Sequence, residues 1–204
     1  MNQIKWIIFD LGGIVVPEVG KLIRLKIANE LNVSEEWIKE TFISYQRQLM
    51  TGSLTLLEMY SKITKELSVN ISPDHLLLEH LNEYKKYTLT HNKDAVEYIA
   101  ALKKDYKVAC LSNLEIEIHE ICSKTGLYSY FDRVFLSLEL KMQKPDLNVY
   151  LKVLEELGCK PDEIIFTDDR IENVNAANKI GIHALHFSNL DQLKTDVDKI
   201  LSGS

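Results

Sequence analysis

Short apolar runs recur along the chain, and each is followed by a polar turn and then by a stretch with helical spacing. The runs are rich in β-branched and aromatic side chains, and they span residues 4–9, 108–111, 134–136, 164–166 and 182–187. Short continuous apolar runs are typical of strands that are buried on both faces, as in a parallel sheet. The pattern therefore predicts five strands of one parallel sheet.

Helical patterns separate the later strands and have recognisable start and stop residues. The first expected helix begins at Asn92 or Asp94 and runs to residue 102. The other two cover residues 145–158 and 173–181, and both end at a glycine. Proline near the start of a helix and glycine just past its end is the arrangement that helices favour. Strands that alternate with helices predict an α/β fold with a doubly wound, Rossmann-like parallel sheet.

The region between residues 16 and 87 breaks this alternation, because it contains several helix starts and no convincing strand. Ser34 precedes two glutamates, Thr55 and Glu58 match a capping box, and Pro73 follows Ser72 at a helix start. We expect four or so short helices there, forming a lid over the carboxyl ends of the strands. The predicted division is a core of residues 1–16 and 88–204 and a small all-helical cap of residues 17–87, inserted after the first strand.

Composition narrows the class of protein. The chain has 204 residues, a formal net charge of −6 and three cysteines with no CxxC pair. The acidic excess argues against nucleic acid as a partner, and the unpaired cysteines favour a reducing compartment. No apolar segment approaches the roughly 18 residues of a membrane span, and the amino terminus lacks a secretory signal pattern. We expect a soluble, cytoplasmic monomer or homodimer with no membrane partner.

Polar side chains follow the predicted strands where their carboxyl ends would face one crevice. These residues are Asp10, Ser112, Asn113, Lys144, Asp168 and Asp169. Each alone is explained by an ordinary turn or helix cap. Together they predict a crevice with three carboxylates on one side and hydroxyl, amide and ammonium donors on the other.

Three carboxylates that lie close together repel one another and require a cation. Oxygen ligands without histidine or cysteine suit a hard ion, and Mg²⁺ is the expected cofactor. A metal on one side and donors on the other would hold a phosphoryl group for attack. Asp10 would then be the nucleophile and form an aspartyl-phosphate.

Four motifs give the chain a resemblance to a known family. The pattern hhhhDxGG at Asp10, hhhSN at Ser112, KPD at Lys144 and hhhTDDxxxN ending at Asn173 resemble the four motifs of the haloacid dehalogenase superfamily. The helical insert is similar to the small α-helical cap of that superfamily. The segments LSLELKMQKPDLNVYLKVLEELG and IIFTDDRIENVNAANKIGIHAL most resemble the subgroup of glucose-1-phosphate phosphatase and the phosphatase half of soluble epoxide hydrolase.

The resemblance implies a role for each residue at the phosphoryl group. Asp10 would be the nucleophile and a metal ligand. Ser112 and Asn113 would hold the phosphoryl oxygens. Lys144 would neutralise the phosphate and orient Asp10.

The same resemblance implies a metal site. Asp169 would bind the metal directly, together with Asp10 and the backbone carbonyl of Gly12. Asp168 would lie behind these ligands and hold the motif lysine or a metal-bound water, with Asn173 beside it. Dehalogenases proper lack this acidic pair, so it favours metal-dependent phosphate chemistry over carbon–halogen cleavage.

Gly12 departs from the pattern, because most members have an aspartate there that protonates the leaving group and then activates water. Loss of a positioned acid and base lowers a rate by on the order of 10²–10⁴. The substrate could need little protonation, as an anomeric sugar phosphate does. Another group could substitute, and Glu18, Glu115, His119 and Arg170 are near in sequence. The protein could also be a slow phosphatase or a phosphate-binding relic.

The function expected from the sequence is a Mg²⁺-dependent phosphatase for a small phosphorylated metabolite, such as a hexose 1-phosphate. The alternative, from another class, is a catalytically weakened protein that binds phosphate without turning it over. In both hypotheses the partner is a small molecule.

Overall fold

The computed structural model describes residues 3–203, and its centre is one five-stranded sheet. The strands are β1 (Trp6–Phe9), β2 (Lys107–Ser112), β3 (Arg133–Leu136), β4 (Ile164–Asp168) and β5 (His183–His186). All neighbours are parallel, and their order is β3-β2-β1-β4-β5. This confirms the doubly wound parallel sheet predicted from the short apolar runs.

The register of the three central strands aligns their carboxyl ends. Phe9 at the end of β1 lies beside Cys110 of β2 and Thr167 of β4. The backbone N–H of Asp10 donates to the carbonyl of Thr167 at 2.9 Å. The residues that follow these strands therefore emerge at one edge of the sheet, which is where ligands bind in open α/β sheets.

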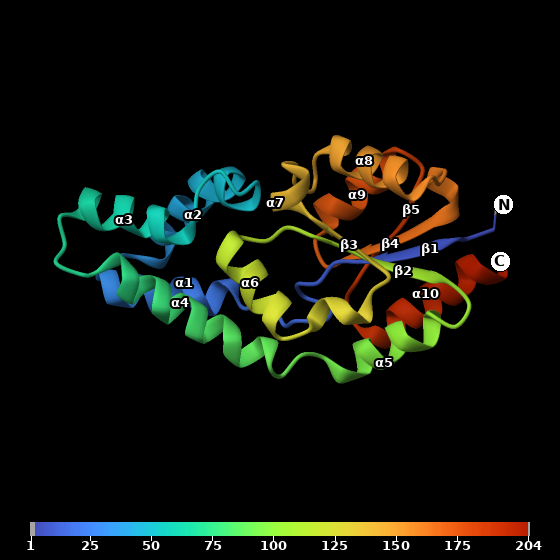
Figure 1. The fold of residues 1–204 in the computed structure, drawn as a ribbon, viewed down its shortest axis with the longest axis horizontal. Helices are drawn as coiled ribbons and strands as arrows, with labels where there is room; N and C mark the ends of the chain where they lie inside the picture. The colour runs from blue at the N-terminus through green and yellow to red at the C-terminus, as the bar shows by residue number, and fades with distance from the viewer. Residues whose placement is uncertain (1–2, 204) are drawn as a thin grey trace.

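Helices cover both faces of the sheet, as Figure 1 shows: α5 (Lys93–Leu102) and α10 (Leu190–Ser202) on one, α8 (Leu147–Leu157) and α9 (Ile171–Lys179) on the other. Successive strand residues point to opposite faces. Accordingly, Ile7 and Phe9 pack in the apolar cluster that contains Ile99 of α5, whereas Ile8 packs with Val153 of α8. Shorter elements complete the core: α6 (Ile116–Lys124), α7 (Ser137–Leu140) and the 3₁₀ turns η1 (Leu127–Tyr130) and η2 (Pro161–Glu163).

Four helices form an insert between β1 and α5: α1 (Gly20–Leu31), α2 (Glu35–Met50), α3 (Leu56–Leu67) and α4 (Pro73–Thr88). The predicted start signals are present. The Ser34 hydroxyl accepts the Trp37 N–H at 3.1 Å, and Thr55 and Glu58 form a capping box. The insert lies beyond the carboxyl ends of the strands, at the far end of the molecule from both termini (Figure 1). The division of the chain into domains at residues 16/17 and 87/88 stays a prediction.

The loop between α2 and α3 is held against the core by hydrogen bonds. The buried Ser137 hydroxyl donates to the carbonyl of Met50 at 2.6 Å and accepts the Leu114 N–H at 3.1 Å. Lys141 Nζ donates to the carbonyl of Thr51 at 3.1 Å. One serine thus joins the insert to the segment that follows β2.

The chain returns from the insert beside the loop where it left the core. The backbone N–H of Asn92 donates to the carbonyl of Val15 at 2.8 Å, and its side-chain amide donates to the carbonyl of Ile14 at 3.3 Å. The Asn92 side chain also accepts the Ala95 N–H and so begins α5, which makes Asn92, and not Asp94, the start of this helix.

One predicted boundary is wrong. Helix α9 begins at Ile171 and not at Asn173, and Arg170 before it makes no side-chain cap. The backbone N–H of Arg170 instead donates to Asp168 Oδ1 at 2.9 Å. The Asp168 carboxylate thus bonds to the turn that leads into α9.

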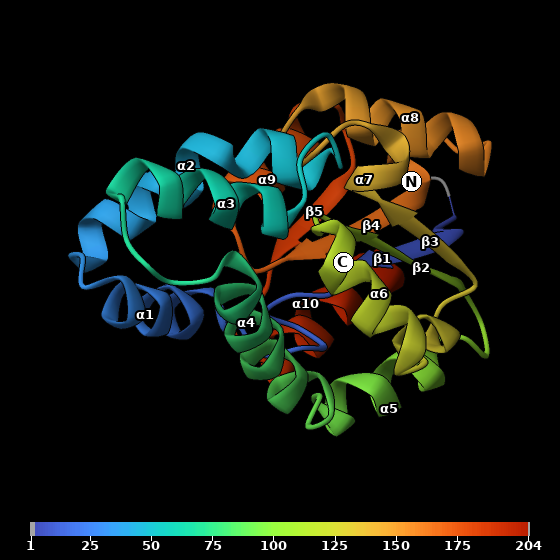
Figure 2. The same ribbon diagram turned by 60° about the vertical axis from the view of Figure 1, so that its left-hand side comes forward.

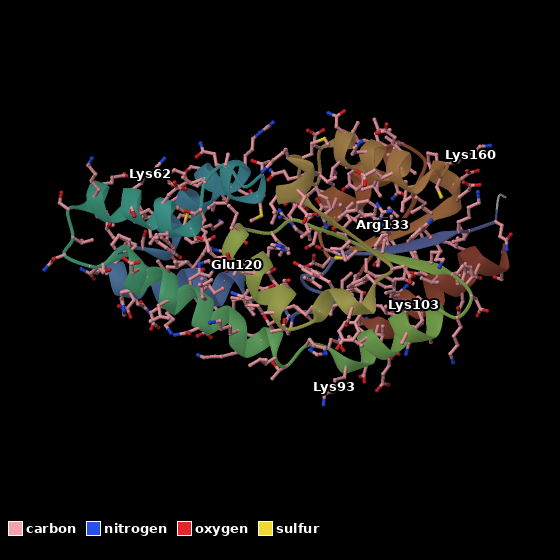
Figure 3. The ribbon with its side chains drawn as sticks, viewed as in Figure 1. Lys62, Lys93, Lys103, Glu120, Arg133 and Lys160 are labelled. Atoms are coloured by element: carbon pink, nitrogen blue, oxygen red, sulfur yellow. The ribbon has the colours of Figure 1, made fainter. Side chains whose placement is uncertain are left out.

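Charged side chains cover the outside of the fold. Lys62 of α3 and Lys93 of α5 point away from the ribbon (Figure 3) and are exposed. Among residues 3–203, no helix is long and apolar enough to cross a membrane. Lys144 differs from these surface lysines, because it is buried.

Candidate active site

Asp10 lies directly after β1, in a loop that turns sharply back on itself. Its side chain is only 8% exposed, and its Oδ1 accepts the Leu11 N–H at 2.7 Å. The loop is closed by the backbone N–H groups of Val15 and Val16, which both donate to the carbonyl of Leu11. The carboxylate is therefore fixed at the carboxyl edge of the sheet.

Lys144 lies between α7 and α8 and reaches the same edge from the other side. Its Nζ is 3.0 Å from Asp10 Oδ1 and 2.6 Å from Asp168 Oδ2, and it donates to the carbonyl of Leu111 at 2.8 Å. Only 2% of the residue is exposed. An ammonium has three donors, and here all three have acceptors, so the buried charge is fully compensated.

Asn113 fixes the backbone of this lysine. Its side-chain Nδ2 donates to the carbonyl of Lys144 at 2.9 Å, and its Oδ1 accepts the Lys144 N–H at 3.0 Å. Both ends of the amide are thus engaged with protein backbone. Ser112, one residue earlier at the end of β2, is buried beside it.

Asp168 is fully buried at the end of β4, and both of its oxygens are occupied. Oδ1 accepts the N–H of Arg170 and Nδ2 of Asn173, each at 2.9 Å. Oδ2 accepts from Lys144 and, at 3.0 Å, from Asn173. This carboxylate holds its neighbours in place and has little capacity left for a direct metal bond.

Asp169 is the most accessible of the three carboxylates. Burial raises its pKa to about 6, and the negative charges of Asp10, Asp168 and Glu18 add to this rise. Oxygens of Asp10, Asp168 and Asp169 lie within 4.8 Å of one another. The backbone carbonyl of Asp169 is 2.9 Å from Nε2 of His186 on β5. The sequence did not indicate this contact.

The pKa values of Asp10 and Lys144 depend on each other and on Asp168. Burial raises the pKa of the Asp10 carboxyl, the positive charge of Lys144 opposes this, and the charge of Asp168 adds to it. Burial by itself lowers the pKa of Lys144, but the charges of Asp10 and Asp168 outweigh it, so the net pKa is raised. The lysine is therefore cationic, and three carboxylates share a single buried positive charge.

This donor set suits a divalent cation. The groups are carboxylate oxygens, which are ligands that Mg²⁺ prefers. One ammonium leaves the cluster with excess negative charge, and a cation would lower the pKa values of Asp10 and Asp169 and keep both ionised. The accessible Asp169 and the Asp10 carboxylate are placed to bind it, whereas Asp168 is already committed.

Gly13 also belongs to the site. The sequence shows it only as the second glycine of a pair and does not indicate its role. Its φ is +71°, and a Cβ atom there would overlap the Asp169 carboxylate. Gly12 has no such restriction, because a Cβ built on it meets nothing within 4 Å. The second glycine of the pair is therefore required by geometry, and the first is not.

Comparison with known proteins gives one family. The model of the haloacid dehalogenase-like hydrolase family matches residues 4–181. A flavin mononucleotide hydrolase from Arabidopsis thaliana is 35% identical over 47% of this chain and 39% of its own length. A D-ribitol-5-phosphate phosphatase from Bacteroides thetaiotaomicron is 22% identical over 98% of this chain and 100% of its own length.

A solved structure has the same fold. A haloacid dehalogenase family enzyme from B. thetaiotaomicron, in complex with magnesium and inorganic phosphate, aligns with a TM-score of 0.72 at 22% identity. The alignment covers 93% of this chain and 98% of that one. The comparison extends over the insert as well as the sheet.

Proposed function

The chain belongs to the haloacid dehalogenase-like hydrolase family, and on this basis we propose that it is a Mg²⁺-dependent phosphatase for a small phosphorylated metabolite. One observation carries the proposal: Lys144 Nζ lies 3.0 Å from Asp10 and 2.6 Å from Asp168, while Asp169 remains accessible beside them. A cation held by oxygens and an ammonium next to one carboxylate are the requirements of phosphoryl transfer.

Mg²⁺ would be held by the carboxylates of Asp10 and Asp169 and the backbone carbonyl of Gly12. When bound, it would neutralise charge on the phosphoryl oxygens and keep the carboxylates ionised. The magnesium and phosphate bound by the B. thetaiotaomicron enzyme support this assignment.

Donors from two segments, the end of β2 and the loop before α8, would hold the phosphoryl group. These are the Ser112 hydroxyl, the Lys144 ammonium and Asn113. The side-chain amide of Asn113 already bonds to the backbone of Lys144. We therefore assign the contact between Asn113 and the phosphoryl group to the backbone N–H of Asn113. Asp168 would keep Lys144 in place, and Asn173 would keep Asp168 in place.

Asp10 would perform the covalent step. Its carboxylate oxygen attacks phosphorus, the bond from phosphorus to the leaving oxygen breaks, and an aspartyl-phosphate forms. Water then attacks phosphorus and releases inorganic phosphate and the Asp10 carboxylate.

The substrate class that we favour is a sugar or polyol phosphate, with hexose 1-phosphate as one candidate. The full-length similarity to a D-ribitol-5-phosphate phosphatase supports this class. The insert over the strand ends favours small substrates over folded proteins, since a lid excludes bulk water. A reducing, cytoplasmic compartment fits the free thiols of Cys110, Cys122 and Cys159.

The test is phosphate release from a panel of sugar phosphates, polyol phosphates, nucleotides and short acid phosphates in Mg²⁺. Asp10→Asn should abolish release, and Asp74→Asn, on exposed α4, should not. Full turnover by Asp10→Asn would refute the nucleophile assignment.

The second candidate function, phosphate binding without turnover, is favoured by the absence of a carboxyl group at Gly12. Mg²⁺ with beryllium fluoride, a phosphate mimic expected to attach to Asp10, separates the two. No adduct, together with no hydrolysis of any panel member, would support the binding protein, whereas an adduct with hydrolysis supports the phosphatase.

A further inference from the structure

Position 12 has room for a side chain but lacks one. A Cβ on Gly12 meets no atom within 4 Å, and Gly12 is not among the glycines with positive φ. Neither packing nor backbone conformation therefore explains why the usual carboxyl group is missing. A phosphatase with this site needs its proton donor from elsewhere unless its leaving group is already acidic.

Two of the four neighbouring candidates are engaged away from the crevice. The His119 Nδ1 is 3.0 Å from the Tyr128 hydroxyl, and the two rings stack at 5.7 Å between centroids. The exposed Arg170 donates through Nε to Glu172 at 2.8 Å, and a guanidinium does not give up its proton.

Glu18 is also a poor candidate. It is exposed, and its Oε1 accepts the Gly20 N–H at 2.9 Å, at the start of α1. One oxygen of the Glu18 carboxylate is therefore engaged at the start of α1, and the side chain is open to solvent.

Glu115 lies between the end of β2 and the start of α6. It is the residue before α6, three residues after Ser112, and its side chain is only partly accessible. Helix α6 stands between the sheet and the helices of the insert (Figures 1 and 2). The next acidic residue, Glu117, accepts the Leu57 N–H of α3 at 3.3 Å, so this turn is held against the insert. Glu115 thus lies where the strand ends meet the lid.

The side chains that interact with the charge of Glu115 are acidic or neutral. The groups near enough to interact with its charge are Glu117, Glu18 of the loop before α1, Tyr60 of α3, Tyr84 of α4 and Cys122 of α6. Burial raises the pKa of its carboxyl group to about 7, and the charges of both glutamates add to this. Glu18 interacts both with Glu115 and with Asp169 at the strand ends.

We infer that Glu115 protonates the leaving oxygen and then activates water, in place of the carboxyl group that position 12 lacks. The inference rests on the proposed function. As Asp10 attacks phosphorus and the bond to the leaving oxygen breaks, the Glu115 proton passes to that oxygen and the product alcohol departs. In the second step the Glu115 carboxylate takes a proton from the water that attacks the aspartyl-phosphate, which restores both carboxyl groups.

The test compares Glu115→Gln with Glu117→Gln, a neighbour on the same helix turn, on an alkyl phosphate and a p-nitrophenyl phosphate. An alcohol needs a proton to leave and nitrophenolate does not. Glu115→Gln should therefore lower kcat/KM for the alkyl phosphate by on the order of 10²–10⁴. With the aryl phosphate it should keep a first-turnover burst of nitrophenolate. Glu117→Gln should retain the wild-type ratio between the two substrates.

Two further measurements separate this role from a structural one. In the wild type, kcat/KM for the alkyl phosphate should fall as pH rises above about 7, where Glu115 loses its proton, and Glu115→Gln should lack that limb. Gly12→Asp added to Glu115→Gln should restore alkyl phosphate turnover, because the space at position 12 is open.

Unchanged alkyl phosphate turnover in Glu115→Gln would overturn the inference alone. An equal loss of alkyl turnover and of the aryl burst would also overturn it, since that would indicate damage to phosphate binding or folding. A wild-type chain that releases no phosphate from either substrate would overturn the proposed function and this inference together.

Discussion

At the residue scale, two adjacent glycines follow the nucleophile position and have opposite requirements. Gly13 has a left-handed φ and faces the Asp169 carboxylate, whereas Gly12 faces open space. Position 13 must therefore be glycine, whereas position 12 has room for a larger side chain. The requirement at Gly13 can be measured by adding a methyl group there.

Gly13→Ala should be destabilised by about 1–2 kcal/mol from its backbone conformation and should also need more Mg²⁺ for activity, because the new methyl group displaces Asp169. Gly126→Ala is the matched control, since Gly126 has a φ of +75° but no atom near its Cβ position. Urea unfolding and Mg²⁺ titration of activity give the two readouts. An unchanged Mg²⁺ requirement in Gly13→Ala would contradict the placement of Asp169.

A second residue-scale prediction concerns a histidine that is buried inside the insert. His80 is 2.8 Å from the Tyr60 hydroxyl, and burial lowers its pKa to about 4. The unfolded chain binds this proton near pH 6.5, so the unfolded state holds more protons between about pH 4 and 6.5. The free energy of unfolding should therefore fall as pH drops through this window.

His80→Gln should be less stable than wild type at pH 7.5 and lose this part of the acid sensitivity. Urea unfolding at several pH values measures it. His75→Gln is the control on the same helix, because His75 is exposed beside Glu30. His75→Gln should keep the wild-type dependence of the free energy of unfolding on pH. If His80→Gln also keeps this dependence, His80 is not its source.

At the element scale, polar side chains of the core bond to the insert: Ser137 of α7, Lys141 after it and Glu117 of α6. Ser137 satisfies a carbonyl of the insert and an N–H of the segment after β2, and it is fully buried. A buried group that serves two partners leaves both unsatisfied when it is removed. The Ser137 hydroxyl is therefore a buried polar link between the insert and the strand ends.

Ser137→Ala should lower the free energy of unfolding by about 1–3 kcal/mol and increase protease cleavage in the loop between α2 and α3. Ser129→Ala removes an exposed hydroxyl that bonds only to the nearby carbonyl of Gly126. It should change stability by less than about 0.5 kcal/mol. Equal stability of the two variants would show that Ser137 does not hold the insert.

At the scale of the whole molecule, the strand-end carboxylates oppose folding until a cation joins them. The pKa of Asp169 is raised to about 6, so the folded state holds more protons than the unfolded state between about pH 4 and 6. The free energy of unfolding of the metal-free chain should fall across this range as pH rises. Metal binding requires ionised carboxylates and stabilises only the folded state.

Mg²⁺ should therefore raise the Tm more at pH 7.5 than at pH 5, measured against NaCl of equal ionic strength. Asp169→Asn should be more stable than wild type without Mg²⁺ at pH 7.5 and should lose the increase in Tm. A Mg²⁺ effect of equal size at both pH values, or its retention in Asp169→Asn, would argue against a metal at this edge of the sheet.

Sequence patterns sufficed for features that depend on local spacing and on aligned strand ends. The alternation of short apolar runs and helices predicted the sheet, and the strand-end rule brought Asp10, Lys144 and Asp168 together. Ser137 could not be found in this way, because a serine after a strand looks like any turn residue. The engagement of the Asn113 amide with the Lys144 backbone likewise depends on a contact between distant loops.

The return of the chain at Asn92, bonded to the loop it departed from at Val15 and Ile14, brings the two ends of the insert together. The number and length of the helices between these ends can therefore change without moving the ends of the strands. Recognition can then diversify while bond-breaking chemistry is inherited intact.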